Sequence, residues 1–191
     1  MKKQDLEEKT TKRTEIFQGK IIEVVLDEVT LPDGRPASRE LVFHKGAVAI
    51  MALDHLGRML FVRQFRKPLE KITLEIPAGK IDPGEEQSPE QTAKRELEEE
   101  TDYQAEYWEE VCGMYSTPGF SNEFLTIYWA EDLQKAANPL SADEDEFLAV
   151  KALTLAEAKA AIQSGLICDA KTIYAVTYWE LRLVKGRSID G

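Results

Sequence analysis

A short helix near the middle of the chain constrains the fold more than any other feature of the sequence. Ser88 is a residue type that caps helix N-termini, and Pro89 suits the first helical position. Gln91 completes a capping box with Ser88. These start signals predict a helix from Ser88 to about Glu100 or Thr101.

Three carboxylates share one side of this predicted helix. At about 100° per residue, Glu96, Glu99 and Glu100 lie on the half that borders the apolar stripe, and Glu98 lies opposite. Like charges at this spacing repel one another, and a divalent cation would relieve the repulsion. Carboxylate oxygens suit Mg²⁺. Taken alone, a Glu-rich helix is better explained as a solvated acidic face on which Arg95 pairs with Glu99.

A glycine-containing loop, residues 78–87, precedes the helix. Gly79 and Gly84 would let the backbone approach ions and phosphates closely. A carbonyl in this loop, such as that of Ala78, would add an oxygen ligand. The alternative is an ordinary connection between a strand and a helix.

Strands dominate the rest of the sequence, and helices come late. We expect a charged, frayed N-terminus over 1–13 and then a β-hairpin unit over about 14–43. This divides the chain into an N-terminal tail with a β unit, 1–43, and a second domain, 44–191. A mixed sheet covered by helices, an α/β (α+β) fold, is the natural packing. Further strands are predicted at 47–53, 59–65, 73–76, 108–115, 124–130 and 147–153, and helices at about 155–164 and 169–184.

Composition argues against several functions. The chain has 35 acidic and 24 basic residues, so its net charge of −11 disfavours binding to nucleic acid or to an anionic membrane. Cys112 and Cys168 fit no metal-ligand spacing, so we expect reduced thiols. No apolar segment follows the basic N-terminus, and the longest apolar stretch, 46–53, is too short to span a bilayer. We therefore expect a soluble, cytoplasmic protein.

The segment 79–103 resembles a Nudix box, whose pattern is G-x5-E-x7-R-E-U-x-E-E-x-G-U with U apolar. The matching residues are Gly79 and Glu85 at the opening and Arg95, Glu96, Leu97, Glu99 and Glu100 in the core. Nine residues, not seven, separate Glu85 from Arg95, which leaves Glu86 as an alternative to Glu85. Asp102 stands where the pattern has glycine.

The resemblance extends to the ADP-ribose pyrophosphatases of the family. The segments VRQFR (62–66) and EIPAG (75–79) are similar to those that lead into the box there, and Pro118 resembles a mark of this subgroup. The resemblance implies a Nudix-type α/β/α sandwich that uses Mg²⁺, or alternatively Mn²⁺, to split ADP-ribose into AMP and ribose 5-phosphate. It also implies a homodimer in which the N-terminal unit reaches its partner.

The same resemblance implies roles for individual residues. The metal ligands would be Ala78, through its carbonyl, with Glu96, Glu99 and Glu100, where Glu99 alternatively orients water. Arg95 would anchor the acidic helix. A late acidic loop, residues 143–147, resembles a loop of the same subgroup. The general base would be Glu146 of this loop, with Glu144 as the alternative. The candidates for substrate binding are Arg66, Arg63, Arg39, Glu123 and Pro118, with Phe17 for adenine stacking. Arg39, Glu123 and Phe17 are explained at least as well as ordinary surface or core residues.

Two choices remain open at this level. Guanidinium groups match phosphate oxygens, but only one of Arg63 and Arg66 can face the site from a regular strand, and we favour Arg66 because it lies near the loop. The substrate would otherwise be another nucleoside diphosphate sugar or a dinucleotide. Two hypotheses lie outside the enzyme class. One is a nucleotide-sensing Nudix domain without activity, and the other is an acidic interaction protein without an active site.

Overall fold

The computed structural model describes residues 2, 5–82, 84–85, 87–141 and 147–189. The chain forms two units. The N-terminal unit comprises residues 1–46 and 114–125, and the core unit comprises 47–113 and 126–191. Within the described residues, no helix has both the length and the apolar character needed to cross a bilayer.

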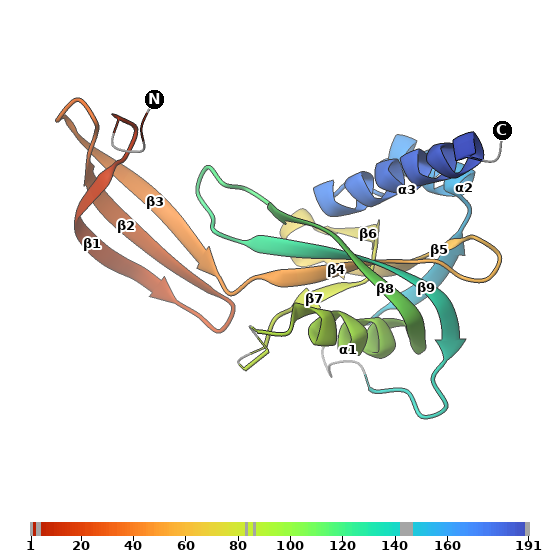
Figure 1. Cartoon of the computed structure of the whole chain (residues 1–191). Coiled ribbons are helices and arrows are strands. Elements are labelled where there is room, and N and C mark those ends of the chain that lie inside the picture. The colour runs from red at the N-terminus through yellow and green to blue at the C-terminus, as the bar shows by residue number, and fades with distance from the viewer. Residues whose placement is uncertain (1, 3–4, 83, 86, 142–146, 190–191) are drawn as a thin grey trace. The chain divides into compact units, whose positions relative to one another are not determined.

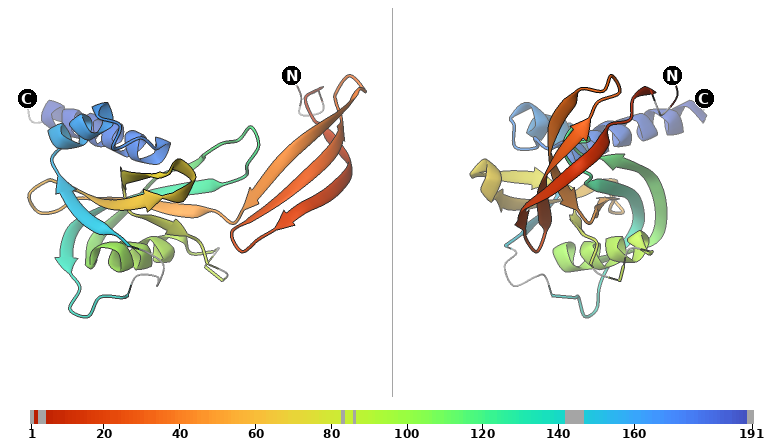
Figure 2. Two further views of the ribbon diagram at one scale, coloured as in Figure 1. Left: turned by 180° about the vertical axis from the view of Figure 1, so that it is seen from behind. Right: turned by 90° about the vertical axis from the view of Figure 1, so that its left-hand side faces the viewer.

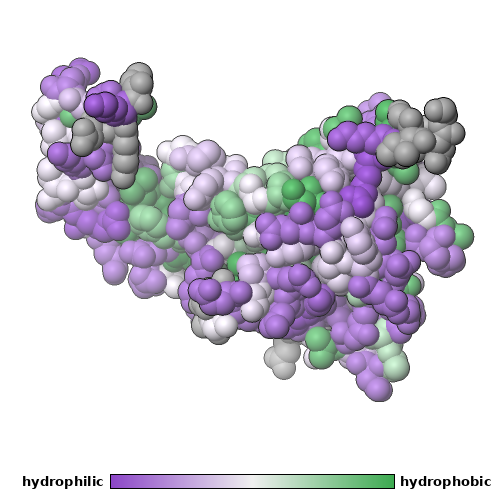
Figure 3. Space-filling view, viewed as in Figure 1, coloured by the Kyte–Doolittle hydropathy of each residue, from purple (hydrophilic) through white to green (hydrophobic). Residues whose placement is uncertain are grey.

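The N-terminal unit is built on an antiparallel sheet of β1 (Lys9–Gln18), β2 (Ile22–Thr30) and β3 (Pro36–His44), in that order (Figure 1). The expectation of a two-stranded hairpin after a frayed tail was therefore wrong, because residues 9–13 form the first half of β1. The reason is tertiary: Arg13 pairs at 2.7 Å with Asp27 of β2, whose side chain is buried. Hydrophobic residues are also exposed at the surface of this unit (Figure 3).

The core unit holds two sheets with helices on both sides. One sheet has the order β10-β5-β6 and the other β7-β4-β9-β8. Helix α1 lies on one side of them, and α2 and α3 lie on the other (Figures 1 and 2). The predicted α/β (α+β) fold is confirmed. The bounds are β4 (Ala47–Ala52), β5 (Met59–Arg66), β6 (Lys71–Glu75), β7 (Ala78–Lys80), β8 (Tyr103–Tyr115), β9 (Phe124–Lys135), β10 (Ala149–Leu153), α1 (Pro89–Thr101), α2 (Leu155–Gln163), α3 (Ala170–Ile189) and the short 3-10 helix η2 (Lys67–Leu69).

Strand β7 falls in the segment that was expected to be only a loop. Its residues pair antiparallel with β4, with Ala78 opposite Ala49 and Gly79 opposite Val48. Strand β4 is buried along its whole length, so it fixes the position of β7 from inside the core. The connection into α1 therefore starts from a rigid element.

Helix α1 packs its apolar stripe on this core, and its start differs in detail from the prediction. Leu97 is fully buried in a cluster that also contains Val48 and Ile50 of β4. Ser88 holds the N-cap position, but its side chain makes no cap hydrogen bond. The predicted capping box was therefore wrong: the N–H groups of Gln91 and Thr92 donate to the backbone carbonyl of Ser88 instead.

Candidate active site

The acidic face of α1 turns inward as its periodicity predicts. The exposed fraction is 8% for Glu96 and 6% for Glu100, and Glu99 is partly exposed. Glu98 points elsewhere, where it accepts hydrogen bonds from the side-chain amide of Gln104 and from the backbone N–H of Leu140. Two buried carboxylates one helical turn apart carry a large desolvation cost unless positive charge lies nearby.

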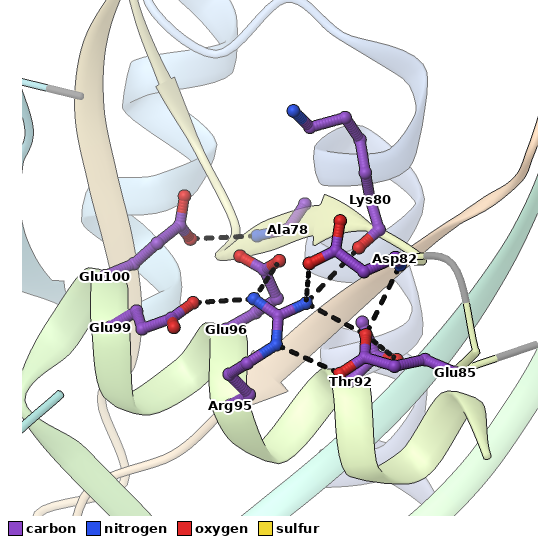
Figure 4. Close-up of polar contacts among 9 residues, drawn as sticks. All are labelled: Ala78, Lys80, Asp82, Glu85, Thr92, Arg95, Glu96, Glu99 and Glu100. Atoms are coloured by element: carbon purple, nitrogen blue, oxygen red, sulfur yellow. Dashed lines mark hydrogen bonds and ion pairs between the residues drawn. The ribbon is translucent and has the colours of Figure 1, made fainter. Parts of the chain in front are cut away.

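Strand β7 lies directly against these carboxylates (Figure 4). The backbone N–H of Ala78 donates to Glu100 Oε2 at 3.0 Å. At Gly79, an added Cβ would stand 1.9 Å from Glu96 Cδ, so any larger residue would displace the Glu96 carboxylate. The residues that the sequence indicated on the loop and on the helix are thus brought together in one place.

Arg95 connects the carboxylates of the loop and the helix (Figure 4). Its guanidinium pairs with Glu99 at 2.7 Å and with Glu96 at 3.0 Å. It also pairs with Glu85 at 3.0 Å. Burial lowers the pKa of Arg95, but these carboxylates outweigh it and raise the pKa above its ordinary value. The Arg95–Glu99 pair expected of a plain acidic surface is therefore present, but as part of a larger, half-buried network.

Glu85 keeps its place in this network despite the two extra residues before the helix. Beyond the ion pair with Arg95, it accepts a hydrogen bond from Thr92 Oγ1 at 2.9 Å. The Arg95 hydrogen bond is the main cause that lowers the pKa of Glu85. Thr92, which the sequence did not single out, is buried on the first turns of α1 and locks Glu85 in position. Glu86 lies outside the described residues.

Arg66 and Arg63 face opposite sides of β5. Arg66 donates to both oxygens of Glu75, from Nε at 2.8 Å and from Nη2 at 2.7 Å. Arg63 is exposed, and its register partner is Leu74, whereas Arg66 shares its face with Glu75 because side chains alternate along a strand. The Glu75 hydrogen bond is the largest cause that raises the pKa of Arg66, and the charge of Glu100 adds to it.

Comparison with known proteins identifies the family. The family model described as NUDIX domain matches residues 43–173. The chain belongs to the Nudix family. A second model, described as nucleoside diphosphate sugar hydrolase N-terminal domain, matches residues 8–42.

Relatives of this Nudix protein match it over nearly its whole length. An ADP-ribose pyrophosphatase of Bacillus subtilis (strain 168) is 45% identical over 177 residues, 93% of this chain and 95% of the relative. A methanol dehydrogenase activator of Bacillus methanolicus is 45% identical over 176 residues, 92% and 94% of the two chains. The fold matches a crystal structure of an ADP compounds hydrolase, with a TM-score of 0.79, 21% identity, and 94% and 95% of the two chains covered.

The donor set of the Nudix helix fits a hard divalent cation. All its candidate side-chain ligands are carboxylates, and the missing side chain of Gly79 lets the Glu96 carboxylate lie directly against the backbone of β7. Among the described residues, no group of three or more acidic, histidine or cysteine side chains is arranged so that it could hold a metal ion. Arg95 holds Glu96 and Glu99 by hydrogen bonds, so cation binding would require these carboxylates to turn from the guanidinium. The candidate bases Glu144 and Glu146 lie outside the described residues.

The remaining candidates belong to the N-terminal unit of this Nudix protein. Arg39 pairs with Glu8, from its Nε at 2.7 Å. Glu123 accepts a hydrogen bond from Ser116 Oγ, in the same segment as Pro118. Phe17 is 54% exposed on β1. The structure therefore brings Arg66, Ala78 and the three helical glutamates together in the core unit, and places the other substrate candidates, except Arg63, in the N-terminal unit.

Glu75 and Lys171 are site neighbours that sequence reasoning missed. Lys171, at the start of α3, donates to Glu75 Oε2. Burial raises the pKa of Glu75, but the Arg66 hydrogen bond and the charge and hydrogen bond of Lys171 outweigh it and lower the pKa to about 2. Glu75 stands in the EIPAG segment, but no pattern in the sequence indicates a partner almost a hundred residues away.

Proposed function

We propose that this Nudix protein hydrolyses the diphosphate of ADP-ribose to AMP and ribose 5-phosphate, with Mg²⁺ as its cation and Mn²⁺ as the alternative. The observation that carries the proposal is the pair of buried carboxylates, Glu96 and Glu100, set against the backbone of β7. Burying such charges side by side is costly, and a cation bridging them to a diphosphate would offset the cost. The full-length similarity to an ADP-ribose pyrophosphatase supports the choice of substrate.

The proposed roles follow from the chemistry of each group. Glu96, Glu99 and Glu100, with the Ala78 carbonyl, would hold the cation, and Glu99 alternatively orients water. When bound, a cation neutralises the diphosphate and acidifies the attacking water. The late-loop Glu146, with Glu144 in reserve, would accept the proton of that water.

Arg66 would bind a substrate phosphate through the part of its guanidinium that Glu75 leaves accessible. Its side chain is 40% exposed, so the group can reach a ligand without leaving its carboxylate partner. Arg95 would keep the acidic helix and the loop together through Glu85 and Glu99. Arg63 is a weaker candidate, because it faces away from Glu75 on the other side of β5.

We also propose a cytoplasmic homodimer in which the N-terminal domain, 1–43, completes the site of the Nudix domain, 44–191. Apolar side chains of the N-terminal sheet support this assembly, since Ile16 is 61%, Phe17 54% and Ile21 53% exposed. Arg39, Glu123, Pro118 and Phe17 would then contact the nucleotide from this unit. Light scattering after gel filtration tests the assembly, and a monomeric mass at catalytic concentrations would contradict it.

Mg²⁺-dependent release of AMP tests the activity. ADP-ribose, other nucleoside diphosphate sugars and dinucleotides are compared as substrates, and ADP-ribose should give the highest kcat/KM. Glu100→Gln should lower the rate by about a hundredfold or more, because it removes a charged ligand of the cation. Glu90→Gln is the matched control, because Glu90 lies on the same helix in an exposed pair with Lys94. Equal rates for the two variants would refute the ligand assignment.

A second candidate function is activation of a partner enzyme. The similarity to the methanol dehydrogenase activator is as high as that to the ADP-ribose pyrophosphatase, so identity alone does not separate them. Methanol dehydrogenase assays with the wild-type chain and with Glu100→Gln distinguish the cases. Activation that survives Glu100→Gln would indicate a role independent of hydrolysis.

A further inference from the structure

We propose that Lys171 is a positioning residue for Arg66: it completes the hydrogen bonding of the buried Glu75, which in turn holds the Arg66 guanidinium toward the diphosphate. This inference rests on the proposed function and adds a residue from α3 to its substrate-binding machinery. It names a side chain that has no place in the Nudix-box pattern and lies far from the box in sequence.

All the hydrogen-bond acceptor positions of the Glu75 carboxylate are occupied. Its Oε1 accepts Arg66 Nε at 2.8 Å and Thr73 Oγ1 at 2.7 Å. Its Oε2 accepts Arg66 Nη2 at 2.7 Å and also the ammonium of Lys171. A carboxylate offers about four acceptor positions, and all are used here. Glu75 is therefore unsuited to bind a cation or to take a proton, and its contacts instead fix the plane of the Arg66 fork.

Glu75 holds one edge of the Arg66 guanidinium. It accepts from Nε and from Nη2, and among the described residues no hydrogen bond from Nη1 is found, so Nη1 can donate to another acceptor. The side chain is 40% exposed, whereas that of Glu75 is 3% exposed. The charge of Glu100 adds to the causes that raise the pKa of Arg66, so the guanidinium lies within electrostatic range of the acidic helix. This arrangement suits an anionic phosphate group.

Lys171 gives the buried carboxylate of Glu75 a second cationic donor. Without it, one acceptor position of Glu75 would lose its partner, and the carboxylate that orients the Arg66 guanidinium would be held less firmly. With it, two cations share the buried carboxylate. Lys171 is itself fixed, because its ammonium also donates to Asp169 Oδ1 at 2.9 Å. That oxygen accepts the backbone N–H of Thr172 at 3.1 Å, at the N-terminus of α3, where the helix dipole offsets part of the charge of Asp169.

The end of β6 is tied to the same helix turn. The backbone N–H of Ile76 donates to Thr172 Oγ1 at 3.1 Å. Ile76 directly follows Glu75 and leads through Pro77 to Ala78, whose N–H binds Glu100. A displacement of Lys171 would therefore change the position of the Arg66 guanidinium and not only the surface of α3.

Equilibrium binding of the α,β-methylene analogue of ADP-ribose with Mg²⁺, measured by calorimetry, tests the proposal without requiring hydrolysis. Lys171→Met should weaken binding by about tenfold, and Lys171→Arg should restore it to within about twofold. In an Arg66→Met background, Lys171→Met should cost less than about twofold, because a residue that acts through Arg66 has nothing left to position. Lys159→Met is the control, since Lys159 pairs with Glu180 at 2.7 Å on the exposed surface of α2 and α3.

Two results would overturn the inference. One is wild-type affinity in Lys171→Met, and the other is an equal penalty in the presence and absence of Arg66. Should Lys171→Met not fold, the Arg66 Nε–H signal in nitrogen NMR of the wild type decides: rapid exchange with solvent contradicts a fixed guanidinium. If the wild type binds the analogue but does not hydrolyse ADP-ribose, only the proposed function is refuted. If the wild type does not bind the analogue, both the proposed function and the inference are refuted.

Discussion

The backbone of Gly79 touches the carboxylate of Glu96 so closely that a β-carbon at residue 79 would stand 1.9 Å from Glu96 Cδ. This contact joins β7 to α1 at the place where the candidate cation ligands meet. Since β7 is paired to the buried strand β4, it cannot move away without disturbing the core. Any side chain at residue 79 would therefore displace the Glu96 carboxylate rather than the strand.

Gly79→Ala should accordingly lower Mg²⁺ affinity and kcat by about tenfold to a hundredfold, because it displaces Glu96 rather than unfolding the helix. Metal titration by calorimetry and AMP release measure the two effects. Gly119→Ala is the control for stability and Mg²⁺ affinity, because a Cβ there meets nothing within 4 Å. Unchanged Mg²⁺ affinity in Gly79→Ala would show that Glu96 does not hold the cation.

Replacing Arg95 should make stability depend more strongly on the cation. In Arg95→Met, the carboxylates of Glu85, Glu96 and Glu99 lose their shared partner, so we expect a loss of about 1–3 kcal/mol without metal. Mg²⁺ should then raise the Tm of the variant by more than that of the wild type. Thermal melts with Mg²⁺ and with a chelator measure the difference, and an equal Mg²⁺ shift in both proteins would count against a cation among these carboxylates.

Glu75 should dominate the acid end of the stability profile. Its pKa is about 2 in the folded chain against an ordinary 4.5, so its stabilisation is complete above about pH 4.5 and is lost as the pH falls toward 2. Glu75→Gln should therefore cost about 3 kcal/mol at pH 7 and progressively less below pH 4.5.

Urea unfolding at a series of pH values measures this effect. Glu180→Gln is the control, because Glu180 belongs to an exposed pair whose loss should cost well under about 1 kcal/mol. A difference between Glu75→Gln and the wild type that stayed constant from pH 7 to pH 3 would contradict the low pKa of Glu75.

The late acidic loop should supply the base. Glu146→Gln should lower kcat by about a hundredfold to ten-thousandfold, with little change in Mg²⁺ affinity, because it removes proton transfer and not a cation ligand. Glu144→Gln should have a smaller effect. The rate of AMP release at saturating Mg²⁺, followed against pH, separates the two. If Glu144→Gln were the more damaging, the roles of the two residues would be exchanged.

Helical periodicity and strand alternation were enough to predict which faces of α1 and β5 carry the candidate site residues. The 3.6-residue period put Glu96, Glu99 and Glu100 on one side of α1 beside Leu97, and the structure buries Glu96 and Glu100 there. The alternation of side chains on β5 separated Arg66 from Arg63. Local patterns succeed here because both elements are regular and each has one face on the core.

Local patterns failed where distant contacts decide the outcome. Residues 9–13 look like a charged tail, but they pair with β2 because Arg13 meets the buried Asp27. The Ser88 capping box was also wrong, since backbone contacts at the helix start replace it. The extra residues before α1 left the place of Glu85 open, and Thr92 and Arg95 hold it in the network.

The sequence by itself determined the acidic helix, the glycine-containing approach to it and the family resemblance, because these depend on neighbours a few residues apart. Only the tertiary structure decided that the Glu96 carboxylate lies against Gly79 and that Lys171 binds Glu75. Such contacts join elements that are distant in the chain, and their geometry is set by how β4, β6, α1 and α3 pack around one core. No local period records that packing.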